Sequence, residues 1–391
     1  MSGFWNLSVV CIQGQHFLKR EALNPEGATT NNSNSNFLRG TRATTLSLYL
    51  NRIHVIALPT KFTRENSSSG AVAFFRAFRA LSVGTKVPQS TVLLATPKRF
   101  ALPLATGLAR NLPKFTLRST KSAAVTEAPI VNLEFYLVPD AGFATTSLTG
   151  KCIEEDVCET DHLTPSEVIW LEQHVDCVRN AARIVDIPAN IMTTNRFVGE
   201  AQTVARCLPG VTCTIISGDD LRRQGFGGIY SVGRASLCPP ALVILSHLPP
   251  NAAKTVAWVG KGIVYDTGGM QLKTKTTMPG MKRDCGGAAA ILYAFRAAVL
   301  GGFSQRLHAL LCIAENSISN VATRPDDIIV MKSGKTVEVN NTDAEGRLVL
   351  GDGVFYAAKS LNADVIIDIA TLTGAQRGAT GDYHAAVITN R

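Results

Sequence analysis

The side chains with the clearest chemical potential stand in the heptapeptide N-T-D-A-E-G-R at positions 341–347. Asp343, Glu345 and Arg347 alternate there, and an extended backbone would place all three on one side. Two carboxylates so close together repel and raise each other's pKa unless a cation neutralises them. A solvated loop is the ordinary setting for such charges. However, the β-rich run Thr336–Val339 and the apolar Leu348–Leu350 flank them and indicate the edge of a core.

A second group of polar residues follows a predicted buried strand, Thr255–Val259. Lys261 stands between two glycines, Asp266 precedes a Thr-Gly-Gly turn, and Asp284 precedes an Ala-rich predicted helix at 288–300. A lysine among glycines suggests a phosphate loop, but the G-x-x-x-x-G-K-[ST] pattern is absent. Carboxylates would repel phosphate, whereas they suit a divalent cation with oxygen ligands. The two groups together therefore favour a metal site.

Both segments resemble the two signature blocks of the leucyl aminopeptidase family, whose members are di-metal exopeptidases that use zinc or manganese. The heptapeptide is unbroken, and the block that starts at Val259 keeps the family's spacing. The run T-T-M-P-G-M-K-R-D-C-G-G-A-A-A at 276–290 is most similar to the aminopeptidase-like 1 branch. Similarity extends from about Ser47 to Arg391 and is strong from Ala181 onward.

The resemblance implies two adjacent divalent metal ions, zinc or manganese. One metal ion would be bound by Lys261, Asp266, Asp284 and Glu345. The other would be bound by Asp266, Asp343 and Glu345. Lys261 can bind a metal only as a neutral amine, so its pKa would have to be strongly depressed by the cations and by burial. Such a pair of metals would activate a water molecule and polarise the scissile carbonyl.

The same resemblance implies the catalytic and substrate-binding residues. Lys273 would remain cationic and stabilise the developing gem-diolate oxygens. Arg347 would hold a bicarbonate ion that acts as the proton shuttle in place of a separate general base. Met281, whose family counterpart lines the pocket for the N-terminal side chain, would bind substrate together with Lys273 and Asp343. Without the family spacing, Lys273 would be interpreted as an exposed lysine and Met281 as a core residue.

Composition limits the domain number, the membrane topology and the cellular compartment that we expect for this protein. A chain of 391 residues with 46% hydrophobic content is expected to form two domains with large cores. It contains no run of 18 uncharged apolar residues, so we predict no membrane span. Nine cysteines without a C-x-x-C motif indicate free thiols in a reducing compartment, which favours the cytoplasm. Cys285, beside Asp284, is interpreted as a small core residue and not as a nucleophile.

Charge is distributed unevenly. Residues 1–125 contain 16 Lys and Arg against 3 Asp and Glu, a charge of +13, which leaves −4 for the rest of the +9 total. A basic half could bind nucleic acid. The segment Phe74–Arg79 nevertheless has the pattern of an amphipathic helix, and no RNA-binding signature is present, so we expect no nucleic-acid partner. The acid-poor start is compatible with a mitochondrial transit segment, but we predict an untargeted extension.

The order of elements predicts an α/β fold with two domains. Residues 1–45 are predicted to be a poorly ordered extension, 46–140 an N-terminal α/β domain similar to the macro fold of the family, and 141–162 a linker. The expected elements of this domain are strands 46–58, 90–95 and 131–138 and helices 70–81 and 101–111. Thr164-Pro-Ser-Glu167 is a capping box with proline at the first helical position.

Residues 163–391 are predicted to form a three-layer α/β/α catalytic domain with a mostly parallel sheet. Its expected strands are 212–216, 241–246, 255–259, 308–314 and 364–368, and its site should lie at their carboxyl ends. Family members continue past Ala375, so the resemblance implies a catalytic domain that is incomplete at its C-terminus.

The predicted function is a metal-dependent aminopeptidase that acts on peptides. Family members are hexamers, so we expect a homo-oligomer without a membrane partner. Two alternatives stay open at this point. One is a catalytically impaired scaffold or isoform, and the other is a nucleic-acid-binding protein that uses the basic half.

Overall fold

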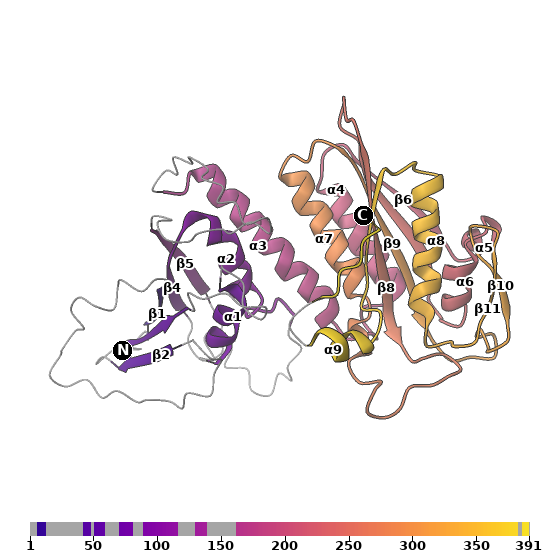
Figure 1. The fold of residues 1–391 in the computed structure, drawn as a ribbon, viewed down its shortest axis with the longest axis horizontal. Helices are drawn as coiled ribbons and strands as arrows, with labels where there is room; N and C mark the ends of the chain where they lie inside the picture. The colour runs from indigo at the N-terminus through magenta and orange to yellow at the C-terminus, as the bar shows by residue number, and fades with distance from the viewer. Residues whose placement is uncertain are drawn as a thin grey trace. The chain divides into compact units, whose positions relative to one another are not determined.

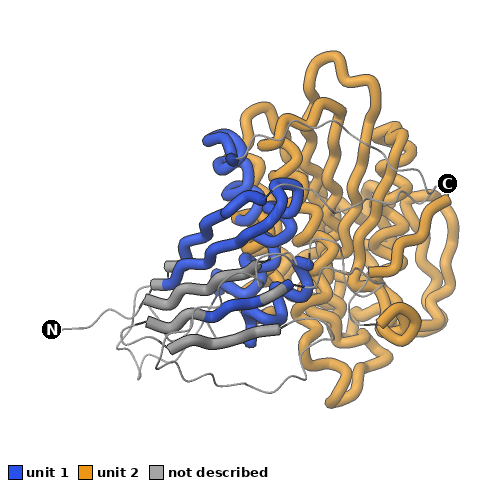
Figure 2. The backbone as a smooth tube through the Cα atoms, turned by 60° about the vertical axis from the view of Figure 1, so that its left-hand side comes forward, with its two compact units in different colours: residues 1–175 blue, residues 176–391 orange. Residues whose placement is uncertain are grey.

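The computed structural model describes residues 6–12, 42–47, 51–58, 70–80, 89–115, 130–138, 162–381 and 385–390. The chain divides into two compact units, residues 1–175 and residues 176–391 (Figure 2). Within the described residues, no helix combines the length and the apolar character needed to cross a membrane.

The first unit contains a sheet of five strands in the order β2-β3-β1-β4-β5. Every neighbouring pair is parallel except β2 with β3. Helices α1 and α2 pack against each other, and Phe74, Phe78 and Leu104 from these helices join strand residues in one buried cluster. The elements are β1 (Asn6–Ile12), β2 (Arg42–Ser47), β3 (Asn51–Ala57), α1 (Ala71–Ala80), β4 (Gln89–Thr96), the single turn η1 (Lys98–Phe100), α2 (Ala101–Ala109) and β5 (Ile130–Leu137).

Two expectations for this unit are corrected. The predicted single strand 46–58 is two antiparallel strands, because Ser47 of β2 pairs with Arg52 of β3 and the chain must reverse between them. The predicted extension 1–45 contains β1, which is the central strand of the sheet, and the start of β2. The run N-L-S-V-V-C-I of β1 has the apolar and β-branched composition of a strand with parallel neighbours on both sides.

The long helix α3 (Pro165–Asp186) begins as the sequence predicts. The Thr164 hydroxyl accepts a hydrogen bond from Glu167 N at 3.3 Å, and Glu167 Oε2 accepts one from Thr164 N at 2.8 Å, which completes the capping box. Most of the predicted linker, 141–161, lies outside the described residues. The proposed domain boundaries and the similarity to the macro fold therefore stay predictions.

The second unit is built on a sheet of five strands in the order β12-β8-β9-β7-β6. Strands β12, β8 and β9 are mutually parallel, whereas β7 is antiparallel to both β9 and β6. Four of the five strands therefore run in one direction, as predicted for a mostly parallel sheet. Their bounds are β6 (Val211–Ser217), β7 (Ala241–His247), β8 (Thr255–Asp266), β9 (Arg306–Asn316) and β12 (Val365–Ile369).

Helices cover both faces of this sheet, which gives the predicted three layers (Figure 1). Helices α4 (Thr194–Arg206) and α7 (Gly286–Leu300) lie on one face, and α6 (Gly227–Gly233) and α8 (Glu345–Lys359) lie on the other. Glycines permit the close approach on each side: a Cβ on Gly260 would meet Ala288 Cα of α7 at 2.6 Å, and one on Gly353 of α8 would meet Val259 at 2.7 Å.

The core between the sheet and α6 and α8 is apolar and continuous. Val259, Leu310 and Val349 are fully buried in it, and each such side chain contributes roughly 1.5–3 kcal/mol to folding. The remaining described elements of this unit are α5 (Asp219–Arg223), the single turn η3 (Met281–Arg283), the hairpin β10 (Ile328–Val330) with β11 (Thr336–Glu338), and α9 (Ala375–Thr380). This packed framework fixes the ends of β8 and β9, where the polar residues gather.

Candidate metal centre

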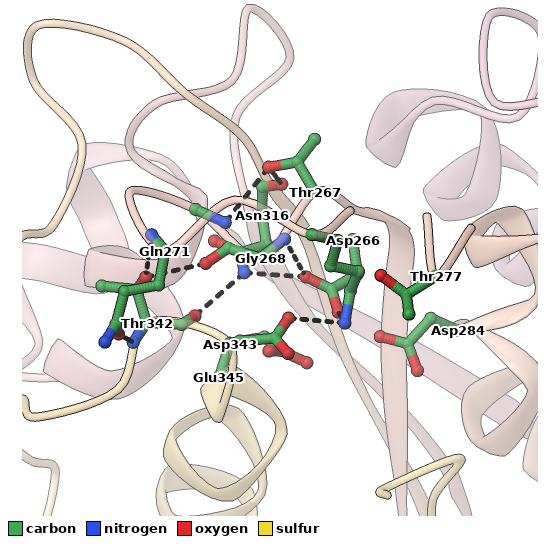
Figure 3. A network of polar contacts seen from close by, with 12 residues as sticks. Asp266, Thr267, Gly268, Gln271, Thr277, Asp284, Asn316, Thr342, Asp343 and Glu345 are labelled. Atoms are coloured by element: carbon green, nitrogen blue, oxygen red, sulfur yellow. Dashed lines mark hydrogen bonds and ion pairs between the residues drawn. The ribbon is translucent and has the colours of Figure 1, made fainter. Parts of the chain in front are cut away.

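The acidic residues singled out in the sequence come from three places that meet beside β8. Asp266 is the last residue of β8, Asp284 lies between η3 and α7, and Asp343 and Glu345 lie at the start of α8. Figure 3 shows the side chains of Asp266, Asp343 and Glu345 directed toward one another. One oxygen from each of these three carboxylates lies within 4.8 Å of the others. The structure thus brings together residues that are distant in sequence.

Most of this acidic group is removed from solvent. Asp266 and Glu345 are 3% and 2% exposed, and Asp284 is 7% exposed, whereas the Asp343 side chain is 35% exposed. Buried carboxylates of like charge are costly unless cations or hydrogen bonds compensate them. The partly exposed Asp343 marks the side from which a ligand can approach.

Two lysines lie among the carboxylates. Lys261 Nζ is 2.9 Å from Asp284 Oδ1 and 2.8 Å from Glu345 Oε1, and it also donates to Thr371 O at 3.1 Å. Lys273 Nζ is 2.9 Å from Asp266 Oδ2 and 2.5 Å from Asp343 Oδ1. The structure therefore places both sequence-predicted lysines within the site, each between two acidic residues.

Two carboxyl groups of the site, those of Asp284 and Glu345, have pKa values above their ordinary range. Burial raises the pKa of Asp284 to about 6 and the pKa of Glu345 to about 7, although Lys261 acts in the opposite direction on both. The neighbouring Asp266 carboxylate also contributes to both upward shifts. Lys261 therefore does not offset the effect of burial on these two pKa values, and further positive charge would stabilise the ionised carboxylates.

The depressed pKa predicted for Lys261 as a metal ligand stays a prediction, because it depends on cations close to its Nζ. Burial lowers the pKa of Lys261, but the adjacent Asp284 and Glu345 carboxylates raise it above its ordinary value of 10.5. For Lys273, burial lowers the pKa, and hydrogen bonds to Asp343 and Asp266 raise it well above the ordinary value. A neutral Lys261 would require positive charge from cations close to its Nζ.

The predicted extended geometry of D-x-E-x-R is wrong. Glu345 is the first residue of α8, so Arg347 lies in the first helical turn and is exposed. Residues two apart in an α-helix are separated by about 200° around its axis, because one turn takes 3.6 residues. Glu345 and Arg347 therefore leave the helix in different directions, while Asp343 in the preceding loop converges with Glu345.

Sequence reasoning missed the polar residues that hold the site together. Asn316 at the end of β9 donates through Nδ2 to Asp266 Oδ1 at 2.8 Å and to Thr342 O at 3.0 Å. Thr342 and Gln271 also exchange hydrogen bonds, with Thr342 N donating to Gln271 Oε1 at 2.6 Å and Gln271 N to Thr342 Oγ1 at 2.9 Å. The only signal in the sequence was an amide side chain near the end of the apolar run of β9, separated from it by Glu315.

The turn after Asp266 depends on glycine. Gly268 and Gly269 have φ values of 86° and 67°, a region that L-residues rarely adopt. Gly268 N donates to Asp266 Oδ1 at 2.9 Å. A Cβ on Gly269 would lie 2.9 Å from Asn316 Oδ1. The turn thus brings the backbone close to the acidic group and to Asn316.

One residue next to Asp284, Cys285, has the surroundings expected of a core residue. Cys285 is fully buried beside Asp284, and burial raises the pKa of its thiol to about 12, which agrees with a core residue. Met281 lies in η3, the single turn that precedes Asp284, and is partly buried. The role of Met281 in substrate binding stays a prediction.

The donor set fits a divalent cation. Asp284 Oδ1 accepts hydrogen bonds from Lys261 and Thr371, and Glu345 Oε1 lies against Lys261. The second oxygens, Asp284 Oδ2 and Glu345 Oε2, are buried and have no hydrogen-bond partner in the part of the chain that the structure describes. Unpartnered buried carboxylate oxygens are rare in folded proteins, and metal coordination is one way to satisfy them.

Comparison with known protein families identifies the domain that contains this acidic group. The profile of the catalytic domain of the cytosol aminopeptidase family matches residues 179–391, which is more than half of the chain. The chain belongs to the cytosol aminopeptidase family. Its acidic group at the end of β8 therefore lies within the matched catalytic domain.

Curated family members are similar over most of this chain. The human protein named Probable aminopeptidase NPEPL1 is 52% identical over 343 residues, which cover 88% of this chain and 61% of that protein. Leucine aminopeptidase 1 of Caenorhabditis elegans is 43% identical, with 88% of this chain and 64% of that protein covered. The chain thus spans less than two thirds of the length of these relatives.

Solved structures of family members share the fold. Leucine aminopeptidase LAP1 of Caenorhabditis elegans matches with a TM-score of 0.79 and 37% identity, covering 97% of this chain and 73% of that one. Leucyl aminopeptidase of Trypanosoma brucei in complex with bestatin matches with a TM-score of 0.76 and 36% identity, covering 98% and 71%. Both matches extend over nearly the whole chain and confirm the predicted fold class.

Proposed function

We propose that this protein is a metal-dependent aminopeptidase that removes N-terminal residues from peptides. The observation that carries the proposal is the group Asp266, Asp343 and Glu345, whose oxygens converge within 4.8 Å in the catalytic domain of this family. The names of the relatives reported above, all aminopeptidases, support hydrolysis over the nucleic-acid-binding alternative.

Two divalent cations, zinc or manganese, would be held by the residues that the resemblance implies. Lys261, Asp266, Asp284 and Glu345 would hold one, and Asp266, Asp343 and Glu345 the other. Asp284 Oδ2 and Glu345 Oε2, which are buried and lack a hydrogen-bond partner among the described residues, support these assignments. When bound, such a pair supplies Lewis-acid activation of water and of the peptide carbonyl.

Lys273 would contribute positive charge from the protein itself. Its Nζ lies between Asp266 and Asp343, and its raised pKa keeps it cationic at neutral pH. An ammonium group fixed beside the reacting carbonyl favours the negative charge that develops on the oxygen, an effect worth roughly 2.7–4 kcal/mol. We therefore infer that Lys273 stabilises the transition state and is not a metal ligand.

The remaining assignments follow the family resemblance. Arg347 is exposed at the first turn of α8 and would bind bicarbonate as the proton shuttle. The partly exposed Asp343, with Lys273 and Met281, would contact the peptide's N-terminal residue. We also infer a cytoplasmic location and a homo-oligomer, a hexamer by resemblance to the family.

Hydrolysis of an aminoacyl-arylamide tests the proposed function. The purified chain, after removal of metals with a chelator, is assayed alone and after addition of manganese or zinc. We expect release of the arylamine only with metal, and no release from the Glu345→Gln variant. Metal-independent release, or equal rates for both proteins, would contradict the proposal. Binding to DNA that weakens steeply with salt would instead favour the nucleic-acid alternative.

A further inference from the structure

Asn316 occupies a position at which one amide group contacts both loops of the acidic site. It is the last residue of β9, it is 5% exposed, and it is paired in register with Asp266, the last residue of β8. Its backbone O accepts from Thr267 N at 3.0 Å and from Thr267 Oγ1 at 2.8 Å, which ties it to the turn after β8. Its side chain is therefore anchored by two buried strands.

The orientation of the Asn316 amide is determined by its neighbours. Nδ2 lies 2.8 Å from Asp266 Oδ1 and 3.0 Å from Thr342 O. A carbonyl oxygen and an ionised carboxylate oxygen accept hydrogen bonds and cannot donate them. The amide nitrogen must therefore face them, and Oδ1 must face Gly269. Both N–H bonds of the amide are used in this arrangement.

The contact with Asp266 determines which of its oxygens is left for other partners. Asp266 Oδ1 accepts from Asn316 Nδ2 and from Gly268 N at 2.9 Å, so this oxygen is occupied. Oδ2 is turned toward Lys273 and the acidic group. Figure 3 shows Asn316, Gly268 and Asp266 in this network. Without the amide, the carboxylate could rotate about its terminal bond, because that torsion has broad minima.

The second contact acts on the other acidic segment. Thr342 O belongs to the residue just before Asp343, so the hydrogen bond from Asn316 fixes the backbone from which Asp343 leaves. Gln271 also holds this segment, because its Oε1 accepts from Thr342 N and its backbone N donates to Thr342 Oγ1. Asn316 differs from Gln271 because it alone of the two also contacts an acidic side chain of the site.

We propose that Asn316 is a positioning residue of the metal centre, which holds the Asp266 carboxylate and the Thr342–Asp343 backbone in the arrangement that binds a divalent cation. The proposal rests on the proposed function, because it presupposes that these carboxylates bind metal. Groups that hydrogen-bond metal ligands orient them, and their loss lowers affinity by about 10–100-fold.

Equilibrium binding of manganese, measured by competition with a chelating dye, tests the proposal. Asn316→Leu replaces the amide with an apolar side chain of similar size, and Asn316→Ala removes it without added bulk. We expect either variant to bind manganese about 10–100-fold more weakly than the wild-type chain. The two single variants are prepared in parallel, so that one remains if the other fails to fold. Circular dichroism will show whether each variant is folded.

Two control variants separate positioning from general stability. Gln271→Ala also loosens the Thr342 segment but leaves the Asn316–Asp266 contact, so its affinity should fall much less. Asp352→Asn alters a fully buried carboxylate that accepts from Ile229 N and Lys332 N, away from the acidic group, and should lower the melting temperature without weakening manganese binding.

Each outcome of this experiment has a distinct meaning. Wild-type affinity in a folded Asn316 variant would overturn the proposal, and so would an equal loss in Gln271→Ala, because loop anchoring alone would then explain it. Absence of manganese binding by the wild-type chain would overturn the proposed metal centre itself, and the role of Asn316 with it. The first two results leave metal binding by the wild type intact, so the two failures are distinguishable.

Discussion

The Nζ of Lys261 lies 2.8 Å from Oε1 of Glu345, although the two residues come from different elements of the second unit, the middle of β8 and the first turn of α8. Gly346, the next residue of α8, makes this approach possible, since a Cβ there would lie 2.9 Å from Lys261 Cδ. The contact joins the two sequence motifs into one site and leaves Glu345 Oε2 buried and, among the described residues, unpartnered.

Loss of either carboxylate at the start of α8 should abolish hydrolysis. Asp343→Asn and Glu345→Gln each remove the charge of a proposed ligand while preserving its size. We expect activity to fall at least ~10²-fold. Even the loss of a residue that only hydrogen-bonds a metal ligand lowers metal affinity or activity by about 10–100-fold. Arylamide hydrolysis and metal content are measured on the same samples. Near-normal turnover with full metal content in either variant would refute the assignment.

The two lysines should respond differently to truncation. Lys273→Ala should lower turnover far more than it lowers metal content, because Lys273 is proposed to act on the substrate oxygen. A loss of roughly 2.7–4 kcal/mol in transition-state stabilisation corresponds to about 10²–10³-fold in rate. Lys261→Ala should lower both metal content and turnover. Equal metal loss in the two variants would show that their roles are not separate.

Stability of the metal-free protein should depend on pH through Glu345. Its pKa is about 7 in the folded protein, against an ordinary value of 4.5, so the folded chain binds more protons than the unfolded chain between these values. In the presence of a chelator, the free energy of unfolding should therefore decrease as the pH rises from about 4.5 to about 7. Titration of Glu345 should contribute less than about 1.4 kcal/mol per pH unit to this decrease. Urea unfolding at several pH values measures it.

Glu345→Gln is the matched control for this pH dependence. Glutamine does not titrate, so the variant should lose less stability across the same interval. A residual slope should persist below about pH 6, because burial also raises the pKa of Asp284 to about 6. Identical slopes for wild type and variant would mean that Glu345 is ionised normally in the folded chain.

The packing of α7 against β12 predicts a contrast between neighbouring glycines. A Cβ on Gly287 would lie 2.0 Å from Ile369 O of β12, whereas one on Gly286 would meet side-chain methyl groups, Thr371 Cγ2 at 3.3 Å and Val185 Cγ1 at 3.9 Å. Gly287→Ala should therefore destabilise the protein by about 1–3 kcal/mol, because the clash is with backbone. Gly286→Ala should be tolerated. Thermal unfolding of both variants decides it, and equal melting temperatures would contradict this packing.

Much of the fold could be predicted from sequence because its elements are locally marked. The apolar run before Gly260 predicted β8, and the structure extends that strand to Asp266. The Thr164–Glu167 capping box marked the start of α3. By contrast, β1 was missed because a short apolar run near the N-terminus does not show which strands it will pair with.

The acidic residues of the site could also be predicted, because their charges cluster in two motifs. Their geometry could not. The alternation of Asp343, Glu345 and Arg347 suggested a strand, but Glu345 begins a helix, a choice made by the packing of α8 against β8 and β9. Asn316 was missed because a single amide carries no spacing signal; only the register of β8 with β9 places it beside Asp266.

The proposed function requires this chain to bind two divalent cations through these residues and to use them for hydrolysis. The most direct measurement is a titration of the metal-free chain with manganese, in which bound metal and arylamide hydrolysis are recorded in the same samples. We predict that activity is absent at the start and rises until two equivalents per chain are bound. Activity that is independent of added metal, or a chain that binds no manganese, would contradict the proposed function.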